Sequence, residues 1–149
     1  MNITDILHTV RHRPYPLPRS PWIMVQSWHE LLFEHWPISP EIMRTLVPAC
    51  MEIDTFERDA WIGVVPFHMS GVRPRGVPSG PGVSAFPELN VRTYVVKNGM
   101  SGVYFFSLDA GNPLAVALAR SLFHLPYFNA RMRSSRVDDT IHYTSVRTH

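Results

Sequence analysis

A β-hairpin at residues 86–109 constrains this 149-residue chain more than any other stretch. Runs of β-branched and aromatic side chains flank Asn98-Gly99, a dipeptide suited to a two-residue turn because both turn residues must accept a positive φ. Counting outward from this turn predicts that Glu88 faces Asp109. One face of the hairpin is then apolar, and the other carries five polar side chains: Glu88, Asn90, Arg92, Ser107 and Asp109.

This polar face has two interpretations. An antiparallel sheet often exposes one face to water, which would explain the polar side chains with no further role. Alternatively, the sheet closes on itself and the polar face lines a pocket. The hairpin alone does not decide between them.

Composition limits the classes of protein and partner. We expect one domain spanning residues 1–149, because 45% of the residues are hydrophobic and the length suits a single core. A net charge of +2 with scattered arginines predicts no nucleic-acid partner. No apolar run approaches the length of a membrane span, so we expect no membrane partner. One cysteine excludes an internal disulfide and is typical of the cytoplasm.

The pattern of secondary structure predicts an α+β chain that is mainly β. Ser39-Pro40-Glu41 marks the start of a short helix. Strands are expected at 51–56 and 60–69, followed by a loop at 70–82 that carries Arg73. The last two expected strands lie at 131–137 and 140–146.

The longest predicted helix begins after the hairpin, with Asn112 as N-cap and Pro113 at the first helical position. Its apolar positions recur with helical spacing, so we expect this face to belong to the core. The face consists of Leu114, Ala117, Leu118, Ser121, Leu122 and Leu125.

Few residues suggest chemistry. The eight histidines lack metal-ligand spacing, and we expect no metal and no cofactor, since no phosphate loop or dinucleotide fingerprint is present. Glu88 and Asp109 are the candidate catalytic acid and base, because mutual repulsion between two buried carboxylates would raise one pKa. Arg92 could neutralise them or bind a substrate carboxylate. His35 is either structural or lines the same site.

Several segments resemble the YqjF-like family of uncharacterised bacterial proteins, within the acetoacetate decarboxylase-like superfamily. The resemblance runs from about Trp22 to Met132. It implies a closed, cone-shaped β-barrel with an internal pocket, a strand at Trp28 to Trp36, and Glu88 near the pocket glutamate of the decarboxylases. The segments are His35-Trp36-Pro37, MRTLVPACMEIDTF, AWIGVVPFHMSGVRPRG, FPELNVRTYV and GVYFFSLDAGNPLAVALAR.

The chain departs from that family pattern in two ways. The decarboxylases follow the long helix with a Tyr-Pro-Lys-Lys run that supplies the Schiff-base lysine, whereas here the stretch is Leu125-Pro126-Tyr127-Phe128 and Lys97 is the sole lysine. Schiff-base decarboxylation is therefore not expected. Family members also run on beyond the length of this chain, so we expect the domain to lack their C-terminal strands, and homo-oligomerisation through an uncovered edge is one consequence.

We therefore predict a protein that binds, and could convert, a small organic molecule in a barrel pocket. The alternative is a non-catalytic structural or interaction module that kept the fold. The hairpin cannot turn both faces to one cavity, so two of the predicted lining residues, Tyr104 and Phe106, are the weaker members. The predicted ligand-binding set is Glu88, Asn90, Arg92, Tyr104, Phe106, Arg73 and His35.

Overall fold

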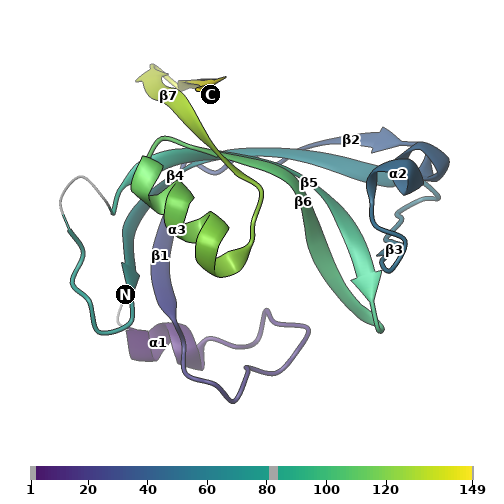
Figure 1. The fold of residues 1–149 in the computed structure, drawn as a ribbon, viewed down its shortest axis with the longest axis horizontal. Coiled ribbons are helices and arrows are strands. Elements are labelled where there is room, and N and C mark those ends of the chain that lie inside the picture. The colour runs from purple at the N-terminus through teal and green to yellow at the C-terminus, as the bar shows by residue number, and fades with distance from the viewer. Residues whose placement is uncertain (1–2, 81–83, 149) are drawn as a thin grey trace.

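The computed structural model describes residues 3–80 and 84–148, which form one curved, open sheet with three helices (Figure 1). The predicted mainly β organisation is confirmed, and the open sheet is an incomplete barrel. Its strand order is β1-β4-β5-β6-β7-β8, with β2 added to β4 and β3 added to β5. The elements are α1 (Ile3–His8), β1 (Met24–His29), β2 (Glu34–Ile38), α2 (Pro40–Leu46), β3 (Glu52–Ile53), β4 (Ala60–Pro74), β5 (Phe86–Lys97), β6 (Met100–Ala110), α3 (Pro113–Phe123), β7 (Tyr127–Val137) and β8 (Thr140–Arg147).

The central hairpin, β5 and β6, has the predicted turn. Asn98 and Gly99 both have positive φ, 53° and 73°, and the pairing follows the prediction from Lys97 opposite Met100 to Arg92 opposite Phe105. Beyond that pair the predicted register is wrong.

A β-bulge causes the change of register. Val91 pairs with Ser107 while Arg92 pairs with Phe105, which leaves Phe106 as an extra residue in β6. Glu88 therefore lies opposite Ala110, and Asp109 lies opposite Leu89. Because side chains alternate along a strand, Glu88 and Asp109 are on opposite faces of the sheet, and the predicted carboxylate pair does not form.

The sheet buries different faces at its two ends. One face, which we call the α3 face, packs Val65, Phe67 and Met69 of β4 against Val116 of α3. The other, the α2 face, packs Ala60 and Val95 against Met43 of α2. The buried side chains of β5 therefore switch faces along the strand. Glu88 and Asn90 are buried on the α3 face, whereas Thr93 and Val95 are buried on the α2 face.

Helix α3 has the predicted start but presents a different side to the sheet. Asn112 accepts hydrogen bonds from the backbone N–H groups of Leu114 and Ala115, as expected of an N-cap. The predicted core face is wrong, because Leu114, Leu118 and Leu122 are 55%, 49% and 67% exposed. The side facing the sheet is instead made of small residues around buried Val116, which let the helix lie close to β6 and β7.

Three other expectations need correction. The resemblance implied one strand from Trp28 to Trp36, but β1 ends at His29 and β2 begins at Glu34, and both pair with β4. The expected strand at 51–56 is only the short β3, which pairs with β5. Strand β4 runs to Pro74, into the expected loop.

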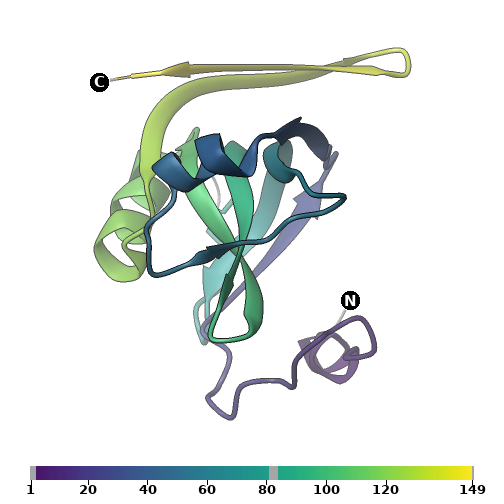
Figure 2. The same ribbon diagram turned by 90° about the vertical axis from the view of Figure 1, so that its right-hand side faces the viewer.

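The C-terminal hairpin, β7 and β8, forms as predicted and projects across the sheet as an arm (Figure 2). Strand β7 begins parallel to β6, with Tyr127 paired to Leu108. Polar bonds hold the arm to the sheet: Asp109 accepts from Ser145 Oγ (3.0 Å) and Arg147 Nε (2.7 Å), and the Tyr143 hydroxyl donates to the Phe67 carbonyl.

The turn predicts a matched pair of substitutions. Gly99→Ala places a Cβ at a φ of +73° with no heavy atom within 4 Å, so the backbone alone should lower the free energy of unfolding by about 1–2 kcal/mol. Gly102→Ala also meets nothing within 4 Å and has no left-handed φ, so it should not destabilise. Urea denaturation measures both, and equal losses would contradict the assigned turn.

Candidate functional site

The α3 face carries a row of polar side chains along β5. Glu88, Asn90, Arg92 and Tyr94 occupy alternate positions and therefore project from the same face. Glu88 and Asn90 are 3% and 2% exposed, whereas Arg92 and Tyr94 are half-buried. The row therefore leads from a deep end at Glu88 to a more accessible end at Tyr94.

At the deep end, Glu88 is bonded to Tyr127 of β7. The Tyr127 hydroxyl donates to Glu88 Oε2 over 2.9 Å. Burial raises the pKa of Glu88 to about 7, against the opposing effect of the Tyr127 hydrogen bond. Burial, and then repulsion from Glu88, raises the pKa of Tyr127. Glu88 therefore changes protonation state near neutral pH, and Tyr127 remains a hydrogen-bond donor.

At the accessible end, Arg92 lies among aromatic side chains. Its guanidinium carbon is 5.1 Å from the Phe33 ring centre and 5.7 Å from that of Tyr94, and Nη2 donates to the Tyr94 hydroxyl over 3.3 Å. His35 Nε2 is hydrogen-bonded to the same hydroxyl at 2.6 Å. The ring of His35 lies close to Gly63, where a Cβ would be 3.1 Å from Nε2 and would require a small shift of the ring.

Two polar atoms of the row lack partners. Asn90 Oδ1 and Arg92 Nε are buried and have no hydrogen-bond partner among the described residues. Within residues 3–80 and 84–148, Arg92 forms no salt bridge either. An unpartnered buried acceptor or donor costs roughly 1–3 kcal/mol, so these atoms mark where a ligand group would gain binding energy.

The other predicted site residues lie elsewhere. Tyr104 and Phe106 pack against the core cluster of the α2 face, so they do not share a cavity with Glu88. Arg73 pairs with Val25 at the far end of β4 and donates to the Gly71 carbonyl. Asp109 is bonded to the arm. Of the predicted set, only Glu88, Asn90, Arg92 and His35 come together.

Three residues of the site were absent from the predicted set: Phe33, Tyr94 and Tyr127. Tyr94 could have been found, because it follows Arg92 at the next position on the same face of β5. Tyr127 contacts Glu88 from a strand 39 residues away, and no local pattern indicates that contact. Phe33 lies between β1 and β2, where a continuous strand was expected.

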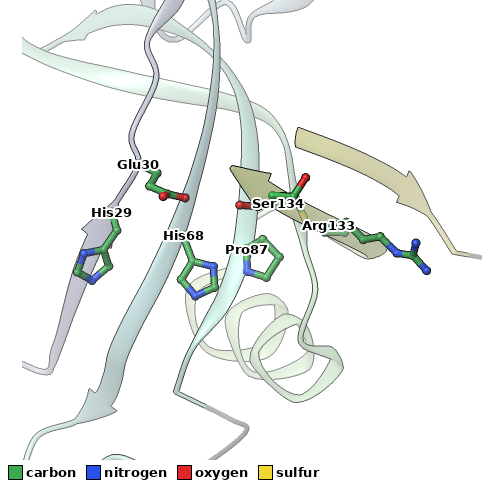
Figure 3. Close-up of a pocket in the computed structure, with 8 residues that line it drawn as sticks. His29, Glu30, His68, Pro87, Arg133 and Ser134 are labelled. Carbon is green, nitrogen blue, oxygen red and sulfur yellow. The ribbon is translucent and has the colours of Figure 1, made fainter. Parts of the chain in front are cut away.

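A separate open groove of about 1100 Å³ lies between the arm and the sheet (Figure 3). Its lining includes His29 and His68, which are paired across β1 and β4. In Figure 3 the Arg133 side chain points away from both imidazoles. No residue of the polar row lines this groove, so it is distinct from the candidate site.

Among the described residues, no three His, Cys, Asp or Glu side chains lie together as ligands for a metal ion. No helix in the same part of the chain is long and apolar enough to span a membrane.

Solved structures with this fold include acetoacetate decarboxylases. One superposes with a TM-score of 0.64 at 19% identity, over 98% of this chain and 57% of the decarboxylase. The enzyme from Legionella pneumophila gives 0.60 at 15% identity, over 97% and 53% of the two chains. The enduracididine biosynthesis enzyme MppR, solved with pyruvate, gives 0.58 at 12% identity, over 81% and 46%. The expected acetoacetate decarboxylase-like fold is confirmed.

Sequence comparison identifies closer relatives. The chain is 51% identical over 131 residues to the uncharacterized protein YqjF of Bacillus subtilis (strain 168), which covers 88% of this chain and 54% of YqjF. It thus spans about half the length of that relative. Residues 25–149 match the DUF2071 family, described as an uncharacterized conserved protein. The chain belongs to this YqjF-like family, which has the acetoacetate decarboxylase-like fold.

Proposed function

We propose that the protein binds a small organic molecule with an anionic group on the α3 face, along the row from Arg92 to Glu88. The buried, unpartnered Arg92 Nε supports this most directly. A guanidinium without a carboxylate partner among the described residues suits an incoming carboxylate or phosphate oxygen, which it can bind through two parallel N–H groups. Asn90 Oδ1 offers an acceptor at the next position.

The surroundings of Arg92 are already arranged for such a ligand. The Phe33 and Tyr94 rings lie against the guanidinium, and His35 and Arg92 both bond the Tyr94 hydroxyl. These contacts restrict the side chain before a ligand arrives, which lowers the entropy lost on binding.

Amine catalysis is not part of the proposal. The sole lysine, Lys97, is exposed beside the Asn98-Gly99 turn, and the resemblance places Tyr127 and Phe128 where the decarboxylases carry lysines. Any chemistry on this face would therefore use Glu88, whose pKa of about 7 allows both proton donation and acceptance near neutral pH.

A second candidate function is a non-catalytic interaction module. Helix α3 favours it, because Leu114, Leu118 and Leu122 form an exposed apolar stripe. If this stripe mediates self-association, light scattering at micromolar concentration should give a mass above 17.1 kDa, and Leu118→Glu should return the monomer. A monomeric wild type would count against this candidate function. It would not bear on the proposed small-molecule site, which lies on the other side of α3.

Arg92 provides the test of binding. In a thermal-shift screen, organic acids that bind the site should raise the melting temperature of the protein, since ligands that bind only the folded state stabilise it. Arg92→Gln should abolish the shift, whereas Arg120→Gln on the exposed side of α3 removes the same charge and should keep it. Equal shifts of melting temperature in both variants would show that the acids do not bind through Arg92.

Glu88 gives a pH-dependent prediction. Because its pKa is raised from 4.5 to about 7, the stability it contributes is present below pH 4.5 and is lost as pH rises through 7. Glu88→Gln keeps an acceptor for Tyr127 and should be more stable than wild type above pH 7, by roughly 3 kcal/mol at 1.36 kcal/mol per pKa unit. Urea denaturation from pH 4 to 8 measures the difference. Exposed Glu52→Gln is the control and should show no such trend.

A further inference from the structure

Tyr127 and Glu88 together form the deep end of the proposed binding site. We propose that this pair catalyses proton transfer at a carbon next to a carbonyl group, with the Glu88 carboxylate as base and the Tyr127 hydroxyl as donor to the carbonyl oxygen. This inference rests on the proposed function, because it requires that a ligand enters the α3 face.

The geometry brings a base and an electrophilic donor to one point. Tyr127 Oη and Glu88 Oε2 are 2.9 Å apart, and they come from separate strands, β7 and β5. A carbonyl oxygen that takes the place of Oε2 as acceptor for Tyr127 leaves the neighbouring C–H group beside the carboxylate. This is the arrangement that general base catalysis and oxyanion stabilisation require.

Apolar neighbours strengthen the effect of both groups. Phe67 and Ala110, the residues paired with Glu88 on either side, are 0% and 1% exposed. Hydrogen bonds to a developing enolate oxygen contribute more in such a water-poor environment than at a surface. Tyr127 keeps its proton there because burial raises its pKa, so it acts as a donor throughout.

The step balances without a co-reactant. The Glu88 carboxylate takes the proton from the carbon as the C–H bond breaks. The electron pair of that C–H bond forms the C=C bond of an enolate, and the enolate oxygen accepts a hydrogen bond from the Tyr127 hydroxyl. The protonated Glu88 then returns a proton to the same carbon, giving exchange, or, where the substrate has a second C=C bond conjugated with the enolate, to the γ-carbon, giving isomerisation. Neither outcome oxidises or reduces the substrate.

The row also indicates the shape of the substrate. Arg92 and Glu88 are four residues apart on one strand, or about 13 Å between their Cα atoms. An anionic group at Arg92 and a carbonyl group at Glu88 therefore imply an extended chain of several carbons between the two groups. The class is a carbonyl compound with a distant anionic group.

Deuterium exchange followed by NMR tests the proposal. The full chain is incubated in D₂O with 4-oxopentanoate, 6-oxoheptanoate and 8-oxononanoate. Exchange next to the carbonyl group should exceed the buffer rate by at least about tenfold for one of the longer acids, and the rate should rise with pH around a midpoint near 7, where Glu88 ionises. Glu88→Gln should reduce exchange to the buffer rate.

Tyr127→Phe, with Glu88 intact, should lower exchange at least about tenfold, by loss of the oxyanion donor. Tyr104→Phe makes the same chemical change on the α2 face and should leave exchange unchanged. If Glu88→Gln does not fold, the Tyr127→Phe rate and the pH profile of the wild type decide the proposal.

Binding is measured in the same samples by saturation-transfer NMR. Binding without accelerated exchange would overturn the proton-transfer inference and leave the proposed binding function standing. Exchange that persists in both Glu88→Gln and Tyr127→Phe would also overturn it. Failure of all three probes to bind would exclude this substrate class, and failure of the whole acid screen would remove the proposed function as well.

Discussion

The β-bulge at Phe106 determines which side chains surround Glu88. With the extra residue in β6, small Ala110 lies opposite Glu88 and Leu108 lies opposite Asn90. Without it, alternation would place Asp109 opposite Glu88, and two carboxylates would share one buried face. Bulges often occur where a strand must redirect a side chain near a functional site. This one separates the two acids of the hairpin and gives each a different neighbour.

The polar row is costly to stability in the protein alone. Among the described residues no cation lies beside buried Glu88, so its carboxyl binds a proton more readily in the folded state than in the unfolded state. Arg92 is half-buried against two aromatic rings, and its Nε has no hydrogen-bond partner in the part of the chain that the structure describes. Leucine or valine on this face would pack against Val65 and Phe67 with no desolvation cost. Core packing therefore does not explain the row.

Local signals in the sequence predicted local structure well. The Asn98-Gly99 turn, the Ser39 and Asn112 caps and the final strand pair all depend on neighbouring residues, and all are confirmed. The bulge and the orientation of α3 depend on packing between distant segments, so periodicity misassigned both. The candidate site shows the same contrast between local and distant signals. Alternation along β5 predicted that Glu88 and Arg92 share a face, whereas the contact with Tyr127 depends on tertiary structure.

Strand β7 connects the candidate site to the arm. Its first residue, Tyr127, pairs with Leu108 of β6 and bonds Glu88 on the α3 face. The same strand continues into the arm, which Asp109 holds through Ser145 and Arg147 from the opposite face. The two carboxylates of the hairpin therefore bond the two strands of the arm from opposite faces of the sheet: Asp109 pairs with half-exposed Arg147 of β8, and Glu88 accepts a hydrogen bond from the Tyr127 hydroxyl of β7. Environment, rather than residue type, gives these acids different roles.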